Sequence, residues 1–336
     1  MSTIEHRLGS HVIPPGRLRI MSQNLPTLLG FSVLAAVPIL SVNAFTQSLL
    51  IEIMISAILA MSLNLLLGQT GLVSLGHAAF FAIGAYAAAI CANSFSSDVI
   101  VALAGAVLIG VLLAIPIGWL SIRVSGFYFL MITFAFAQMV YVAAFRWSWL
   151  TGGSDGLTVQ PFTLLGVPIL QARSEVYAYV LLAFALSFVA LQRLCASSFG
   201  QVLAGIRENT KRMRALGYNV RAYKLAAFVI AAAFSAFSGV LYVAFSSFVS
   251  PENAYWTQSA AVLVMVLIGG AGTMIGPVIG AALILILQHW SSSHTEHWNT
   301  ILGLLFITVI WVSPDGIVGV GRRIRNRIWG GEDARA

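Results

Sequence analysis

Charged residues divide the chain into long apolar stretches, and their spacing predicts membrane-spanning helices. A charged side chain is costly at the centre of a bilayer, so a run without Asp, Glu, Lys or Arg marks a candidate span. Nine such runs hold at least 17 residues: 20–51, 53–97, 99–122, 124–145, 156–172, 176–192, 225–251, 253–295 and 297–314. We reject the run 156–172 as a span, because Pro161, Gly166 and Pro168 favour an extended loop.

Two of the eight remaining runs are too long for a single crossing. Residues 53–97 and 253–295 make up 45 and 43 residues, whereas one helix crosses the hydrocarbon in about 20. Glycine clusters at 68–71 and 269–272 mark where each run folds back. The pattern therefore predicts ten spans, at 28–46, 49–67, 72–92, 99–120, 124–145, 176–192, 225–246, 259–270, 274–290 and 300–313.

Composition supports an all-α, polytopic membrane helix bundle of about 10 transmembrane helices. Of 336 residues, 59% are hydrophobic and 9% are charged, whereas a soluble domain carries roughly a quarter charged residues. Soluble enzymes, disordered chains and secreted disulfide scaffolds are therefore excluded. The two cysteines, Cys91 and Cys195, fall on opposite sides of the predicted membrane and have no metal-binding spacing, so we expect neither a disulfide nor a metal site.

The basic residues give the predicted bundle an orientation. With the N-terminus in the cytoplasm, inside segments hold 16 of the 18 Lys and Arg residues and outside loops hold only Arg146 and Arg173. This asymmetry follows the positive-inside rule, and it accounts for the net charge of +7 without nucleic-acid binding. We expect a cytoplasmic arm at 1–27, a membrane domain at 28–314 and a cytoplasmic tail at 315–336.

The largest inside loop, about 193–224, has the pattern of an amphipathic helix at 199–217. Ser198 and Gln201 fit a capping box at its start, and Gly217 fits the left-handed position after its end. Apolar residues recur between them at helical spacing, with the basic residues largely elsewhere.

This segment has two interpretations. A basic amphipathic helix can lie on anionic lipid, or it can dock a cytoplasmic partner. Glu208 and Arg212 are spaced as a favourable ion pair along one helix.

Polar residues within or beside the spans are candidates for a translocation path. They can equally bond to neighbouring helices, which is the common role of such residues in membrane bundles. The candidates are Asn64, Ser74, His77, Thr133 and Gln138. Glycines at 76, 84, 272, 276 and 280 add positions where helices can approach closely.

The outside loop 146–175 and a histidine cluster are the other polar features. Gly152, Gly153 and the Asp155–Gly156 pair are typical of turns. A second outside loop holds His289, His294, Glu296 and His297, which we expect to stay solvated without binding metal.

Five motifs in order resemble the M-type permease subunit of branched-chain amino-acid ABC importers. The resemblance covers about residues 50 to 320. The motifs lie at Ser62–Tyr86, Gly126–Phe129, Thr151–Leu157, Phe199–Gly217 and Gly269–Pro277.

The resemblance implies a multicomponent importer in the bacterial inner membrane. A second, H-type permease would complete the pore, with two ATPase subunits that bind ATP and Mg on the inside and a periplasmic binding protein outside. Family members are expected to carry branched-chain amino acids, urea or amides, or aromatic acids. The implied ATPase contacts are Phe199, Gly200, Ile206, Arg207, Glu208, Asn209, Ala215, Leu216 and Gly217. The implied dock for the binding protein is Thr151, Gly152, Gly153, Ser154 and Asp155.

The loop departs from the Glu-Ala-Ala pattern of other importers, because Asn209 and Thr210 follow Glu208. This weakens comparison with those importers but not with the M-type family.

The energy source is expected to lie outside this chain. A P-loop needs Gly-Lys-Ser/Thr, and Lys211 and Lys224, the two lysines present, follow Thr210 and Tyr223 instead. An ion-coupled carrier favours acidic residues deep in the membrane, and no predicted span has one at its midpoint. The principal hypothesis is an importer subunit without enzymatic activity or cofactor. The alternative is an ATP-independent channel or facilitator, whereas an intramembrane enzyme has little support.

Overall fold

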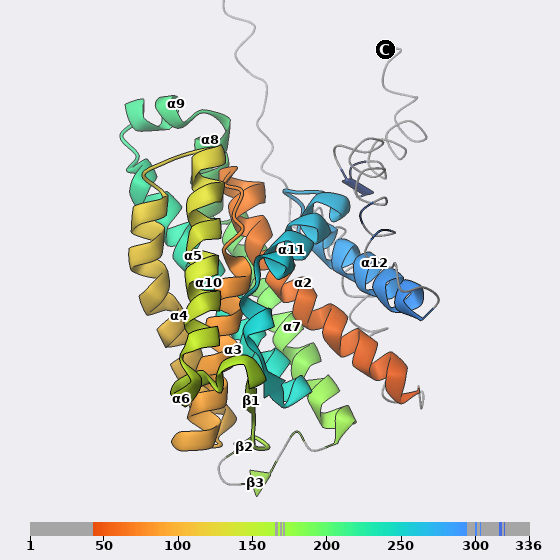
Figure 1. Cartoon of the computed structure of the whole chain (residues 1–336). Helices are drawn as coiled ribbons and strands as arrows, with labels where there is room; N and C mark the ends of the chain where they lie inside the picture. Colours follow the sequence, from red (N-terminus) through yellow and green to blue (C-terminus); the bar gives the residue numbers. More distant parts are fainter. Residues whose placement is uncertain are drawn as a thin grey trace, which may run out of the picture. The chain divides into compact units, whose positions relative to one another are not determined.

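The computed structural model describes residues 43–164, 167–168, 170, 172–293, 300, 303, 316–317 and 319. Long helices dominate this part of the chain, which agrees with the predicted all-α membrane bundle (Figure 1). The long helices are α2 (Ala44–Thr70), α3 (His77–Ser94), α4 (Val99–Ser121), α5 (Phe127–Arg146), α7 (Arg173–Ala196), α10 (Val220–Ser246), α11 (Trp256–Gly269) and α12 (Ile275–Ser292).

Shorter elements lie in the loops at the two ends of the bundle. At one end are the helices α8 (Ser198–Glu208) and α9 (Thr210–Ala215). The opposite end holds α6 (Ser148–Thr151), the 3₁₀ helices η1 (Gly153–Asp155) and η2 (Pro251–Ala254), and the two-residue strands β1 (Leu157–Thr158), β2 (Thr163–Leu164), β3 (Val167–Pro168) and β4 (Phe248–Val249). Strands β1 and β4 pair antiparallel, as do β2 and β3.

Seven helices within the described residues are long and apolar enough to cross a membrane, and α11 is a shorter apolar helix of 14 residues. These eight helices correspond to eight of the ten predicted spans. The predicted span 300–313 falls almost entirely outside the described residues. The predicted span 28–46 is described only at 43–46, where α2 begins. The total of ten therefore stays a prediction.

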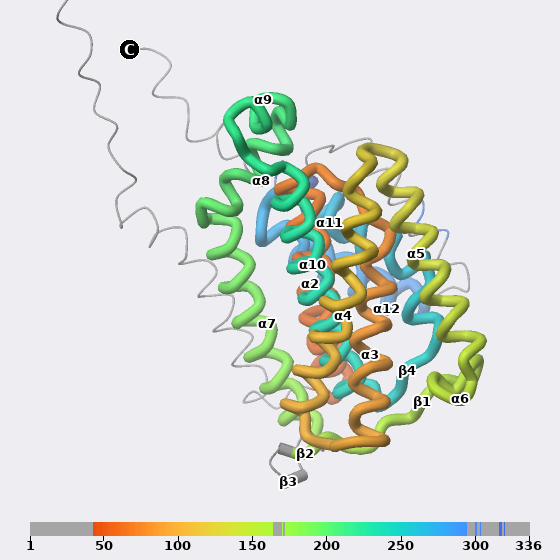
Figure 2. The backbone as a smooth tube through the Cα atoms, turned by 90° about the vertical axis from the view of Figure 1, so that its left-hand side faces the viewer, coloured from red at the N-terminus to blue at the C-terminus, as the bar shows by residue number. Residues whose placement is uncertain are grey.

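Helices α2 and α10 form the centre of the bundle, and α4 and α5 lie at its surface (Figure 2). Helix α2 packs against α7, α10, α11 and α12, whereas α10 packs against α2, α3 and α4. The outer face of α4 carries large exposed apolar side chains, including Leu108, Leu112 and Ile115. Exposed aliphatic side chains on a spanning helix are suited to contact with lipid.

Glycines bring two pairs of helices into backbone contact. A Cβ atom at Gly84 of α3 would overlap the Ala236 carbonyl of α10, and one at Gly239 of α10 would overlap the Phe81 carbonyl of α3. Gly280 of α12 lies equally close to the backbone of α11. The close-approach role predicted for Gly84 and Gly280 is confirmed, and the crossings are tightly packed.

We predict that Gly84→Ala lowers the free energy of unfolding by about 1–3 kcal/mol, because the new methyl group forces α3 and α10 apart. Gly105→Ala is the matched control, since Gly105 of α4 has open space around its Cβ position and gains about 1 kcal/mol of helix propensity. Thermal unfolding in detergent measures both. Equal melting temperatures for the two variants would contradict the close crossing.

Candidate coupling and translocation elements

The loop segment predicted to face the cytoplasm forms two helices, so the single helix predicted at 199–217 is wrong. Asn209 adopts an extended backbone between α8 and α9, and its Oδ1 accepts the backbone N–H of Arg212 at 2.9 Å. This side chain therefore caps α9 and interrupts the helix. The expected ion pair between Glu208 and Arg212 is absent in this described loop, because the two residues no longer share one helix.

The boundaries of the two helices follow different signals. The predicted capping box is wrong: Ser197 holds the N-cap position of α8, and its hydroxyl donates to the Leu194 carbonyl. Gly217 takes a positive φ of 88° after α9, as predicted. The N–H groups of Gly217 and Tyr218 bond to the carbonyls of Arg214 and Met213, which is the Schellman pattern.

Helix α8 is seated firmly on the bundle. Its buried residues are Gly200, Leu203 and Ile206, and it packs against α2, α7 and α10. Gly200 meets the backbone of Cys195 so closely that a Cβ atom would overlap it. Phe199 stacks on Tyr223 of α10, with 5.7 Å between ring centroids.

The opposite face of the two helices is charged and exposed. Lys211, Arg212 and Arg214 are exposed on α9, as is Glu208 at the end of α8. Of the other predicted contacts, Asn209, Ala215, Leu216 and Gly217 are also exposed. The element therefore has one face bound to the bundle and one face free to bind a partner.

Arg207 combines the two faces. The residue is exposed, yet its guanidinium donates to the Gly68 carbonyl in the last turn of α2, 139 residues earlier in the chain. A Cβ atom at Gly272, between α11 and α12, would lie 3.4 Å from the same guanidinium. No sequence signal points to this inward contact.

Asn64 joins α2 to the turn between α11 and α12. Its Nδ2 donates to the Thr273 carbonyl at 2.8 Å, and its Oδ1 accepts the Gly272 N–H at 2.8 Å. Asn64 is fully buried, and both polar atoms of its side chain are satisfied by this one turn.

The break between α2 and α3 is the site of the next two candidates, Ser74 and Thr133. The Ser74 hydroxyl accepts the Gly76 N–H at 3.1 Å, and the Thr133 hydroxyl accepts the Leu75 N–H at 3.2 Å. Both side chains are buried. They satisfy backbone donors where the helical ladder is interrupted.

His77 begins α3 beyond this break and is 1% exposed. Neither of its ring nitrogens has a hydrogen-bond partner among the described residues. Ser259 of α11 accepts the neighbouring Ala78 N–H at 2.9 Å. Ser259 was not among the predicted residues, and its one signal was a polar residue at the start of a predicted span.

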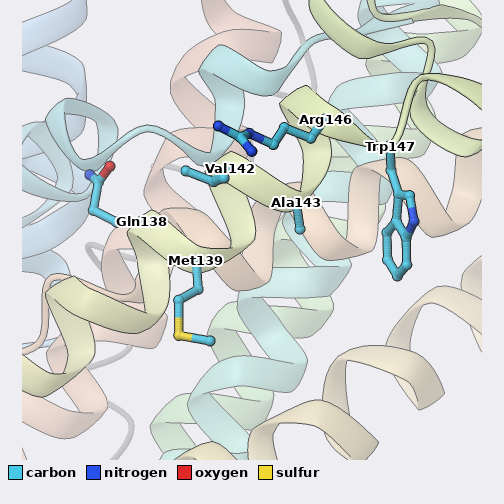
Figure 3. Close-up of a pocket in the computed structure, with 6 residues that line it drawn as sticks. All are labelled: Gln138, Met139, Val142, Ala143, Arg146 and Trp147. Carbon is cyan, nitrogen blue, oxygen red and sulfur yellow. The ribbon is translucent and has the colours of Figure 1, made fainter.

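Gln138 lies on α5, the helix that also carries Thr133. It lines a groove of about 530 Å³ together with Met139, Val142, Ala143, Arg146 and Trp147 (Figure 3). Gln138 is half-buried, and its Nε2 has no partner within the described residues. The lining is otherwise mostly apolar, with Arg146 as its charged member.

The opposite end of the bundle holds the predicted dock at 151–155. The buried Thr151 hydroxyl donates to the carbonyls of Ala144 and Trp147, at 2.6 and 2.8 Å. Gly152 and Gly153 take positive φ values, which confirms the predicted turn. Ser154 and Asp155 are exposed, so these two side chains are free to meet a partner.

No group of three or more His, Cys, Asp or Glu residues that could hold a metal lies within the described residues. His289 instead pairs with Glu52 of α2, with 3.5 Å between Nε2 and Oε2. The other members of the predicted outside cluster, His294, Glu296 and His297, fall outside the described residues.

A family model described as the permease component of branched-chain amino acid transport systems matches residues 45–310. The chain belongs to this family. The match runs from α2 to α12 and includes α8–α9 at one end of the bundle and the loop 151–155 at the other. It confirms the resemblance carried by the five motifs.

The chain is similar to permeases from bacteria and an archaeon. The high-affinity branched-chain amino acid transport permease LivM of Escherichia coli is 30% identical over 308 residues, which are 84% of this chain and 72% of LivM. The permease LivH of Salmonella typhimurium is 27% identical over 52% of this chain and 54% of LivH. A probable LivM permease of Methanocaldococcus jannaschii is 29% identical over 43% of this chain and 42% of its own length. No solved structure matches.

The family match and the seven long apolar helices among the described residues together show that the chain is a multi-pass membrane permease.

We predict that Thr151→Val lowers the stability of the permease by about 1–3 kcal/mol, because the Ala144 carbonyl loses its buried hydroxyl donor while the side-chain shape is kept. Ser154→Ala is the control, since its exposed hydroxyl bonds only to the neighbouring Asp155. Thermal unfolding in detergent measures the difference. A Thr151→Val melting temperature as high as that of Ser154→Ala would show that the hydroxyl has no such role.

Proposed function

We propose that this permease carries branched-chain amino acids, or related small polar solutes such as amides, urea or aromatic acids, into the cytoplasm as a subunit of an ATP-binding-cassette importer. The names of LivM and LivH support the substrate class. The sequence has no P-loop, which supports an ATPase on separate subunits. In this proposal ATP and Mg are bound by those partners, and this chain holds no cofactor.

The observation that carries the proposal is the two-sided element α8–α9. One side is anchored by buried residues of α8, and the other exposes Glu208, Lys211, Arg212 and Arg214. A helix adapted only to lipid would present apolar side chains toward the bilayer, whereas here the apolar face is used against the bundle. The exposed charged face is suited to a protein partner with complementary charge.

The remaining partners follow from the two ends of the bundle. The chain matches both LivM and LivH, which supports pairing with a second, H-type permease. Two ATPases would bind at the α8–α9 end. A periplasmic binding protein would bind the opposite end, where Ser154 and Asp155 are exposed. The permease would lie in the bacterial inner membrane with both termini in the cytoplasm.

In this proposal the solute moves between the two permeases, along the groove of α5. Arg146 provides a cation at the groove, whereas the amide nitrogen of Gln138 is itself buried. The cation suits the carboxylate of an amino acid, because arginine binds carboxylates well. ATP-driven closure of the ATPases would displace α8–α9 and convert the bundle between outward-open and inward-open states.

Leucine uptake is expected to need the complete assembly. In liposomes, the chain with a second permease, two ATPases and the binding protein should accumulate radiolabelled leucine with ATP and lose uptake without it. The chain alone should show no flux. Passive leucine flux through the lone subunit would instead support the channel or facilitator.

The exposed basic residues of α9 are expected to bind the ATPases. Replacement of Lys211, Arg212 and Arg214 together by alanine should reduce ATPase copurification about tenfold, since loss of three exposed charge pairs amounts to ~1.4 kcal/mol. Arg221→Ala is the control, because Arg221 is exposed on α10 beyond α9. Equal copurification of the ATPases with both variants would place their binding site elsewhere.

A further inference from the structure

We infer that Arg207 acts as a transmission residue, which ties the coupling element α8–α9 to α2 and to the α11–α12 turn. The inference rests on the proposed function and concerns how movement of α8 would reach the interior of the bundle. It adds to the contact role that the family resemblance implies for this residue, because the guanidinium of the exposed Arg207 is bonded to the Gly68 carbonyl of the bundle.

The first step is the bond between Arg207 and α2. The guanidinium donates to the Gly68 carbonyl, which is one of the last carbonyls of a helix that ends at Thr70. Such carbonyls have no partner further along the helix and carry its partial negative charge. The N–H groups of Gly71 and Leu72 bond to the carbonyls of Leu67 and Leu66. The Gly68 carbonyl is the next one in this series, and the Arg207 guanidinium on α8 donates a hydrogen bond to it.

The second step is the junction with the α11–α12 turn. Gly68 and Gly272 are in backbone contact, since a Cβ atom at Gly68 would lie 2.7 Å from the Gly272 nitrogen. One turn earlier on α2, Asn64 bonds to both the Gly272 N–H and the Thr273 carbonyl. The end of α2 and the turn are therefore fixed to each other by two hydrogen bonds and by contact.

The third step is the position of the guanidinium between these parts. A Cβ atom at Gly272 would lie 3.4 Å from the Arg207 Nη1, and one at Gly71 would lie 3.4 Å from the Arg207 Cγ. Residues far apart in the sequence thus meet around one side chain. A shift of α8 must either carry α2 and the turn with it or leave the Gly68 carbonyl without its donor.

The consequence is a division of roles within the coupling element. Lys211, Arg212 and Arg214 are exposed and would bind the ATPase, whereas Arg207 would pass the displacement inward. Loss of a binding residue should release the ATPases. Loss of Arg207 should leave the ATPases bound and able to hydrolyse ATP, while the permease no longer follows.

The test uses the complete reconstituted assembly and measures leucine uptake and ATP hydrolysis in the same liposomes. The variant Arg207→Met keeps an unbranched aliphatic side chain but has no donor. We expect its ATPases to copurify as in wild type, and leucine taken up per ATP to fall about tenfold. For Arg207→Lys, which keeps a charged donor group, leucine uptake per ATP should stay within about threefold of the wild-type value. The Lys211/Arg212/Arg214 alanine variant is the matched contrast, since its ATPase copurification should fall about tenfold.

Asn64→Ala provides an independent arm, because it releases the α11–α12 turn without a change in α8. It should also lower uptake per ATP while the ATPases stay bound. If the Arg207→Met permease does not fold, this variant decides the inference. Wild-type uptake per ATP in Arg207→Met or in Asn64→Ala would overturn the transmission role, as would loss of the ATPases from Arg207→Met. Absence of ATP-dependent uptake in the wild-type assembly would overturn the proposed function instead.

Discussion

The interior of a bilayer offers no hydrogen-bond partner, so each backbone group at a break in a spanning helix must be satisfied by the protein itself. This constraint explains the polar residues around residues 71–76. Leu75 bonds to Thr133, the seventh residue of α5, about 9 Å along that helix at 1.5 Å per residue. The break therefore extends into the bundle, where Ser74, Thr133 and Ser259 supply acceptors to its N–H groups.

The same constraint applies where α2 ends. A helix terminus inside a membrane protein leaves carbonyls that require donors, and here the donor comes from α8, outside the spanning helices. A single requirement of backbone chemistry thus connects the loop at one end of the bundle with two of its spans. Because Asn64 also fixes the α11–α12 turn to α2, α8 is bonded into the framework of the helix bundle.

The sequence predicted the spans well because exclusion of charge from the bilayer is a property of each segment alone. Eight of the ten spans correspond to helices, and the glycines at 68–71 mark the end of α2 correctly. The restart of α3 at His77, rather than at residue 72, was missed because it depends on bonds to Thr133 and Ser259. These partners are distant in sequence, so local pattern carries no signal for them.

The loop that holds α8 and α9 shows the same contrast between local and distant signals. Its amphipathic character and the Gly217 ending were predicted from nearby residues. The interruption at Asn209 had a local signal, since Asn followed by Thr is typical of a helix start, but the apolar spacing on both sides favoured one continuous helix. The inward direction of Arg207 depends on Gly68, and no sequence pattern indicates such a pair.

The central claim is that α8–α9 faces the cytoplasm, where an ATPase can bind it, while the loop at 151–155 faces outward. The direct measurement is thiol labelling of intact cells with a membrane-impermeant maleimide, after Cys91 and Cys195 are replaced by serine. Single cysteines are then introduced by Asp155→Cys and Arg212→Cys. The account predicts that the cysteine at 155 reacts in cells whose outer membrane alone is permeabilised, and that the cysteine at 212 reacts only after lysis. Labelling at 212 before lysis would contradict it.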